Sequence, residues 1–256
     1  MKRNKIDLNF ILNKPFYPWE KFHAKTKWKK PLEEPNPAEW PKTWKKVYFK
    51  EYPRLDKIFL PKPRESIQKS YLQCLYDRHS SRIFSKIPIS IEQISNLAYF
   101  SAGLKLNKRP WVAARFYASP GARYSIEVYL ISLNSELPKG VFHYNVRSHS
   151  LEILRLLKSI ELDKYINQPW VKNAGLIFVM TAMFDRNTIK YGVRGYRHIM
   201  QEAGHLGQNF YLAGSLLDLS TCAVGGYADD RLNLLLGVDG IKETVVYIFA
   251  AGNKGN

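Results

Sequence analysis

Proline and tryptophan are concentrated at the beginning of this 256-residue chain: nine of the 14 prolines and four of the six tryptophans lie in residues 1–64. Because proline fixes φ and removes a backbone donor, this stretch cannot form one continuous helix or a central strand. Disordered segments are poor in aromatic residues, so Trp19, Trp28, Trp40 and Trp44 argue against a simple disordered tail. We therefore expect an extended basic arm over residues 1–64 and one folded domain over residues 65–256.

The remainder of the chain alternates between helical and strand periodicities without a strict strand–helix–strand order. Ser90 and Gln93 form a capping-box pattern at the start of one helix. We expect helices at residues 66–77, 90–103, 151–157, 197–217 and 229–236, and strands at residues 126–133, 141–144, 176–183 and 244–251. This order predicts an α+β fold, with a central mixed or antiparallel sheet flanked by helices.

The formal net charge of +17 raises the question of a nucleic-acid or membrane partner. Residues 1–70 carry 18 basic against 8 acidic side chains, and the rest carries 21 against 14, so the excess lies mainly in the arm. Basic and aromatic residues alternate there, but no nucleic-acid motif accompanies them, and we expect a solvated basic surface instead. The arm could also attract an acidic peptide substrate.

Two cysteines, Cys74 and Cys222, match no metal spacing and are typical of core residues in a reducing compartment. The longest apolar run, residues 174–184, is too short to cross a bilayer. No dinucleotide fingerprint, phosphate loop or His-Glu-x-x-His motif is present. His198 and His205 are read as structural histidines, no metal is expected, and we expect a cytoplasmic protein.

The segment Arg78-His79-Ser80-Ser81-Arg82 follows the first helical pattern. In an extended segment, residues two apart point to one side, so Arg78, Ser80 and Arg82 would form one row of donors. Arginine forks match phosphate oxygens, so the row suits a phosphate group. Two solvated arginines beside a helix end are the alternative.

Further motifs follow in order: residues 118–124 (Ala-Ser-Pro-Gly-Ala-Arg-Tyr), 190–197 (Lys-Tyr-Gly-Val-Arg-Gly-Tyr-Arg), 202–209 (Glu-Ala-Gly-His-Leu-Gly-Gln-Asn) and 225–227 (Gly-Gly-Tyr). In this order the pieces, over roughly residues 65–252, resemble the nitroreductase superfamily, and within it the SagB/ThcOx-type dehydrogenases that oxidise azoline rings in modified peptides. The resemblance implies the nitroreductase fold and an FMN cofactor held by Arg78, Ser80, Arg82, Ser119, Gly121, Gly225 and Gly226. Pro120 departs from the usual Pro-Ser-Ala-Gly pattern and removes one amide donor.

Lys190 and Tyr191 resemble the catalytic pair of these dehydrogenases, with the lysine as the base that takes a ring proton. If residues 186–194 are helical, Arg186 and Arg194 flank Lys190 and disfavour its charge, which would lower its pKa. A solvated basic stripe is the alternative.

The resemblance also implies a homodimer with the flavin between subunits. We expect the helix that contains Gly204 and Gly207 near the dimer centre, and the arm around the neighbouring subunit. Biosynthetic partner enzymes are possible. Two other functions stay open: an NAD(P)H-dependent reductase of nitro or quinone compounds, and a basic nucleic-acid- or partner-binding protein that retains the fold.

Overall fold

The computed structural model describes residues 18–28, 36–45, 49–64, 66–105 and 114–255. Seven strands form one sheet in the order β1-β4-β3-β2-β5-β7-β6, and all the paired strands are antiparallel. The strands are β1 (Lys57–Phe59), β2 (Ile126–Ser132), β3 (Gly140–Asn145), β4 (Ser150–Leu156), β5 (Leu176–Met183), β6 (Leu219–Val224) and β7 (Glu243–Asn253). The α-helices are α2 (Pro18–Lys25), α3 (Lys42–Lys45), α4 (Tyr71–Asp77), α5 (Ile91–Ala102), α6 (Asp185–Tyr191), α7 (Gly195–Leu216) and α8 (Asp229–Leu236).

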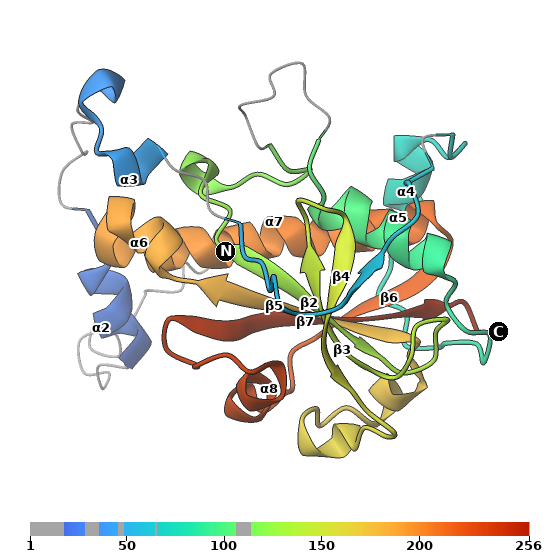
Figure 1. Ribbon diagram of the computed structural model, residues 1–256. Coiled ribbons are helices and arrows are strands. Elements are labelled where there is room, and N and C mark those ends of the chain that lie inside the picture. The colour runs from blue at the N-terminus through green and yellow to red at the C-terminus, as the bar shows by residue number, and fades with distance from the viewer. Residues whose placement is uncertain (1–17, 29–35, 46–48, 65, 106–113, 256) are drawn as a thin grey trace, which may run out of the picture.

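Helices cover both faces of the sheet (Figure 1). Val128 and Leu130 of β2 belong to the core under α5 and α7, whereas Tyr129 and Ile131 belong to the core on the α8 side. This alternation follows from the two-residue period of a strand. Five short 3₁₀ helices complete the described fold: η1 (Pro37–Glu39), η2 (Pro120–Ala122), η3 (Leu162–Lys164), η4 (Pro169–Asn173) and η5 (Gly192–Arg194). The expected α+β class with a flanked central sheet is confirmed.

The helix expected over residues 151–157 is wrong, because these residues belong to β4. Leu151 and Ile153 pack toward one core and Leu154 toward the other, which is a two-residue period. The run is too short for its leucines to distinguish this period from a helical one. The first helix is also shorter than expected: Ser70 caps α4, which begins at Tyr71.

The described part of the arm is not wholly extended. It includes α2, η1 and α3, while β1 pairs with β4 as the edge strand and Leu60 is buried. In Figure 1, α3 lies above α6 and α2 lies below it. The proposed division at residue 64 stays a prediction, but residues 57–60 are part of the sheet and its core.

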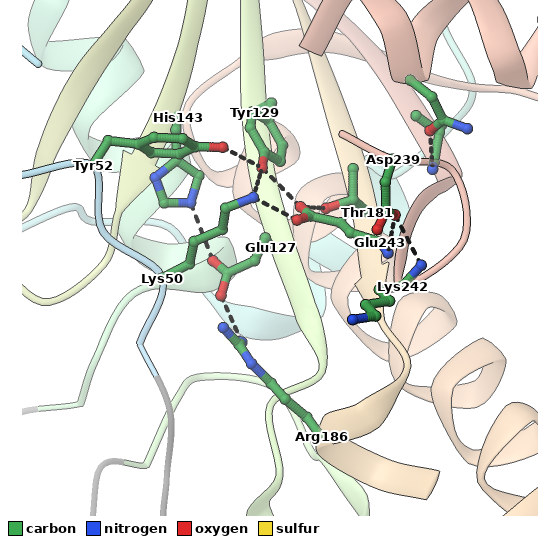
Figure 2. A network of polar contacts seen from close by, with 12 residues as sticks. Lys50, Tyr52, Glu127, Tyr129, His143, Thr181, Arg186, Asp239, Lys242 and Glu243 are labelled. Carbon is green, nitrogen blue, oxygen red and sulfur yellow. Dashed lines mark hydrogen bonds and ion pairs between the residues drawn. The ribbon is translucent and has the colours of Figure 1, made fainter. Parts of the chain in front are cut away.

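A buried ionic network connects the sheet to α6 (Figure 2). His143 of β3 donates from Nδ1 to Glu152 (2.8 Å) and from Nε2 to Glu127 (3.2 Å). Arg186 of α6 pairs with Glu127 at 2.5 Å. Burial alone would raise the pKa of both carboxyls. Arg186 and His143 instead lower the pKa of Glu127 to about 2. His143 and Asn145 lower the pKa of Glu152 to about 2. The network therefore anchors the first turn of α6 to the sheet.

A second group of contacts lies beside it. Lys50, from the arm, bonds to Glu243 of β7 and donates to the Tyr129 hydroxyl at 2.6 Å. Tyr129 and Thr181 both donate to Glu243 at 2.7 Å. Lys50 thus fixes this segment of the arm to β2 and β7 of the sheet (Figure 2). No helix in the described ranges is both long and apolar enough to cross a bilayer.

Candidate functional site

The arginine–serine row lies along the free edge of the sheet, beside β6. The amide of Ser81 donates to the carbonyl of Thr221 (3.0 Å), which holds this segment extended against the strand. The Ser80 hydroxyl lies 2.8 Å from the hydroxyl of Tyr211, on α7. The Arg78 guanidinium lies 5.4 Å from the centre of the Tyr211 ring, so both residues face the same tyrosine.

Arg82 lies with its guanidinium 5.7 Å from the centre of the Trp170 ring, which packs on the other face of the sheet from Tyr211. Among the residues that the structure describes, neither Arg78 nor Arg82 has an ion pair with a carboxylate. Arg78 is half-buried, and Ser80 and Arg82 are exposed. Arginine forks and a serine hydroxyl are donors suited to a phosphate monoester, and the role of these three residues in binding one stays a prediction.

The glycine pair follows the same strand, β6, that the arginine–serine segment borders. We call the residues along this strand the phosphate cluster: Arg78, Ser80, Arg82, Gly225 and Gly226. Gly225 follows the end of β6, and a side chain added there would meet no atom within 4 Å, so its backbone borders open space. At Gly226, an added Cβ would collide with Asn167, so close packing against this side chain explains the glycine without a cofactor. Gly225 lies three residues beyond Cys222, or about 10 Å along the strand. Burial raises the pKa of the Cys222 thiol, while the charge of Arg82 and the hydroxyl of Ser80 oppose the rise, so these two side chains lie close to the thiol.

A second region, the Lys-Tyr cluster, contains Ser119, Gly121, Lys190 and Tyr191. Gly121 has φ +63°, a conformation that glycine adopts without strain. A Cβ at this position would lie 2.5 Å from the hydroxyl of Tyr191. The turn at residues 119–122 and the end of α6 are therefore in direct contact, through a glycine that leaves room for the tyrosine.

Ser119 is bonded to Glu202, a residue that the sequence did not single out. Its hydroxyl donates to Glu202 of α7 (2.9 Å) and accepts from the amide of Tyr124 (2.8 Å). Burial raises the pKa of Glu202 to about 7, although the bond from Ser119 and the charge of Arg115 oppose the rise. The Ser119 hydroxyl is thus used within the chain, and Glu202 stabilises the turn. An acidic residue on the buried side of an amphipathic helix was the signal that could have identified it.

Lys190 faces aromatic rings of the arm. Its Nζ lies 4.0 Å from the centre of the Trp40 ring, 5.4 Å from that of Trp44 and 5.2 Å from that of Tyr191. The expected repulsion required one helix over residues 186–194, but α6 ends at Tyr191 and Gly192 has the non-helical angles φ +56° and ψ −143°. The two arginines also have other partners. Arg186 is engaged with Glu127, while Arg194 donates to the carbonyl of Thr26 and lies over Trp28.

The two clusters lie at different ends of α7. Tyr191 contacts the ring of His198 (4.8 Å between centroids), whereas the phosphate cluster contacts Tyr211. Thirteen residues of helix separate His198 from Tyr211, which corresponds to roughly 20 Å. His205 lies between them and bonds to the carbonyl of Ala118 (3.0 Å). The described ranges contain no group of three residues suited to hold a metal.

Gly207 and Gly204 of α7 have different surroundings. At Gly207, an added Cβ would lie 2.6 Å from the ring of Tyr247, so this glycine lets α7 approach β7 of the same chain. Gly204 is exposed, and a Cβ there would meet nothing within 4 Å. Of the two glycines expected near a dimer centre, only Gly204 therefore lies on an outer surface.

Comparison with known proteins gives a consistent result. The model of the Nitroreductase family matches residues 75–253. A protein of Methanocaldococcus jannaschii that is named as a nitroreductase is 27% identical over 185 residues, which cover 70% of this chain and 89% of that protein. The microcin B17-processing protein McbC of Escherichia coli is 28% identical over 138 residues, 51% of this chain and 51% of its own length. The trifolitoxin-processing protein TfxB of Rhizobium leguminosarum is 28% identical over 146 residues, 54% of this chain and 39% of its own length.

Solved structures agree on the fold. A protein of Ralstonia eutropha described as a nitroreductase superposes with a TM-score of 0.67 at 24% identity, over 78% of this chain and 90% of that one. A chain of the E. coli microcin synthetase McbBCD complex, with a truncated pro-microcin bound, gives 0.60 at 20% identity over the full length of both chains. A Desulfovibrio desulfuricans protein in complex with FMN gives 0.51 at 16% identity, over 74% of this chain and 88% of that one.

Proposed function

Because this chain belongs to the nitroreductase family of FMN-dependent oxidoreductases, we propose that it is a dehydrogenase that oxidises an azoline-like ring in a peptide or related metabolite. The observation that carries the proposal is the contact between the Tyr191 hydroxyl and Gly121, which fixes Lys190 and Tyr191 beside the turn at residues 119–122. A simple reductase of nitro or quinone compounds needs no residue that removes a proton from carbon. A lysine–tyrosine pair held in place on such a turn is what an aromatising oxidation requires.

The reaction converts a thiazoline or oxazoline into the aromatic azole by removing two hydrogens. One ring C–H bond breaks with loss of a proton, and its electron pair forms the new double bond. The neighbouring C–H bond breaks with loss of a hydride, which FMN accepts when bound. In this proposal the neutral amine of Lys190 takes the proton and becomes an ammonium group. Tyr191 orients that amine or relays its proton through the hydroxyl.

The phosphate cluster fits the other end of the cofactor. Arg78 and Arg82 carry charge that no carboxylate of the described residues neutralises, and Ser80 offers a hydroxyl between them. Gly225 presents its backbone to open space, as close approach of a planar ring requires. We assign to these residues the binding of the FMN phosphate and of the ring edge. Ser119 and Gly121 would contribute from the second cluster through the shape of their turn.

The separation of the clusters supports a homodimer as part of the proposal. Within one chain, roughly 20 Å of α7 lies between the two regions. A two-fold arrangement would bring the phosphate cluster of one subunit to the Lys-Tyr cluster of the other, and so form two equivalent sites. Gly204, exposed on α7 between the clusters, is placed to lie near the contact. The described part of the arm contacts α6 and α7 of its own chain, and its contact with the neighbouring subunit stays a prediction.

The nature of the substrate is supported by similarity alone. Two relatives are named as processing proteins for microcin B17 and trifolitoxin, and a structural neighbour belongs to a synthetase complex with a pro-microcin bound. The chain matches about half of McbC and less of TfxB, so their whole activities remain proposals for this protein. We propose a modified peptide as substrate and a ring-forming enzyme as partner.

A thiazoline-containing synthetic peptide provides the test. Purified FMN-loaded protein should remove two hydrogens from it, as detected by mass spectrometry and by the new azole absorbance. Lys190→Met should lower this rate by about 10²–10⁴-fold while FMN content and melting temperature stay the same, because methionine keeps a similar apolar stem. Full turnover by Lys190→Met would contradict the catalytic assignment. Equal rates of nitro-compound reduction by NADPH in both proteins, without any azoline oxidation, would favour the reductase instead.

A further inference from the structure

Two tryptophans of the arm lie against the amine of Lys190. Trp40 follows η1 and Trp44 is in α3, and their ring centroids are 6.2 Å apart with an edge-to-face orientation. The Nζ of Lys190 lies 4.0 Å from the centre of the first ring and 5.4 Å from that of the second. Both side chains are half-buried. Figure 1 shows α3 beside α6, which carries the lysine.

This part of the arm is held in place by Arg123, a buried residue of the turn that contains Gly121. Its Nη1 donates to the carbonyl of Trp44 (2.7 Å) and its Nη2 to that of Thr43 (3.0 Å). Its Nε donates to the carbonyl of Arg186 in α6 (2.7 Å). One guanidinium therefore links α3 of the arm, the turn and α6. Charge-assisted bonds to the last carbonyls of a helix stabilise its end and fix its position.

We propose that Trp40 and Trp44 are positioning residues of the active site, which hold the amine of Lys190 and stabilise the positive charge that it gains when it takes the substrate proton. The inference rests on the proposed function, because it gives the arm a role in the same proton transfer. The arm segment at residues 40–44 is then a part of the catalytic site and not only a basic surface. Arg123 is the residue that docks it.

The physical argument concerns the difference between the two charge states of the lysine. The face of an indole ring attracts a cation far more strongly than a neutral amine. In the reactive form of the enzyme the amine is neutral, so the contact is weak before proton transfer and strong after it, and it is partly gained in the transition state. The same contact favours the unreactive ammonium form of the free enzyme, so kcat values are compared on the alkaline plateau of the pH profile, where the reactive form predominates. An interaction that strengthens along the reaction raises kcat, whereas uniform binding of the substrate lowers KM only. Two indoles that act on Nζ should consequently influence kcat.

The test uses the full-length FMN-loaded protein and the thiazoline peptide. Trp40→Leu should lower kcat by about 2- to 30-fold, the range that corresponds to one cation–π contact, and change KM much less. Trp44→Leu should have a smaller effect, because its ring is farther from Nζ. Trp40→Phe should recover part of the loss, because phenylalanine restores a ring face. Deuterium at the ring carbon that loses the proton should give a larger isotope effect in Trp40→Leu than in the unaltered protein, because this step becomes slower.

Trp19→Leu is the matched control. Trp19 belongs to the same arm, in α2, and its side chain is 64% exposed. This variant should keep kcat, KM and the isotope effect unchanged. A Trp40→Leu protein that loses only substrate affinity, or that keeps the original isotope effect with a lower kcat, would overturn the inference. Full activity of Lys190→Met would instead overturn the proposed function, so the two failures are distinguishable.

Discussion

His143 offers a strong test of the buried network, because both of its ring nitrogens face carboxylates. Burial alone would lower its pKa, but the bonds to Glu127 and Glu152 raise it, which favours the charged imidazolium form. The change His143→Gln removes this charge and leaves Glu127 with Arg186, and Glu152 with Asn145 and Lys57.

Breaking a buried ion pair typically destabilises a protein by about 3–5 kcal/mol. For a domain of this size, one kcal/mol changes the melting temperature by about 2–4 °C, so the variant should melt about 6–20 °C lower. Thermal unfolding followed by circular dichroism at about pH 6 measures this difference. Glu92→Gln, an exposed carboxylate on α5, is a control that should change stability by less than about 0.5 kcal/mol.

The pH dependence has a defined sign. A raised histidine pKa stabilises the fold fully below the ordinary value near 6.5, and the effect is lost as pH rises through the raised pKa. The lowered pKa values of Glu127 and Glu152 stabilise the fold above about 4.5, and the effect is lost as pH falls toward about 2. The difference between the unaltered protein and His143→Gln should therefore be largest at mildly acidic pH. A difference that grows in alkaline solution, or one below about 1 kcal/mol at pH 6, would refute the reasoning.

Three other changes probe the two clusters. Arg78→Ala should weaken FMN binding by about 1.5–3 kcal/mol, measured by fluorescence titration, and an unchanged Kd would remove Arg78 from the phosphate site. Gly121→Ala should lower azoline oxidation and weaken FMN binding, because an alanine with φ near +63° is strained and its Cβ meets the Tyr191 hydroxyl. Unaltered kinetics with an unaltered Kd for FMN would contradict the contact. Glu202→Gln should flatten the stability profile between pH 4.5 and 7, because the unaltered protein loses about 3 kcal/mol there as the unfolded chain ionises this carboxyl and the folded chain does not. The variant should therefore gain stability relative to the parent at pH 8, as measured by chemical denaturation. Identical profiles would refute this effect.

The sequence predicted the fold class and most elements because their patterns are local. The capping box at Ser90 and Gln93 is present, with both reciprocal bonds. The continuous apolar run at residues 176–183 is a strand between two others in the sheet. Residues 151–157 were assigned wrongly because a short leucine-rich run fits both periods, and only pairing with β1 and β3 decides between them.

The candidate site was predictable in part. The two-residue period of an extended segment predicts a row of Arg78, Ser80 and Arg82; the structure places Arg78 and Ser80 at Tyr211 and Arg82 at Trp170, and phosphate binding stays a prediction. The contacts of Lys190 with Trp40 and Trp44 join residues about 150 positions apart, and no local pattern encodes them. The sequence also placed Arg186 beside Lys190 as a repelling charge, whereas the tertiary fold pairs it with Glu127.

Reduction of the flavin by substrate in a single turnover tests the central claim most directly. Under anaerobic conditions, FMN-loaded protein is mixed with the thiazoline peptide and the flavin absorbance is followed by stopped flow. The unaltered protein should lose its yellow absorbance in step with azole formation, and Lys190→Met should bleach about 10²–10⁴-fold more slowly although dithionite reduces both proteins equally. A flavin that stays oxidised in the presence of azoline peptides, but is reduced promptly by NADPH, would contradict the assignment as a dehydrogenase.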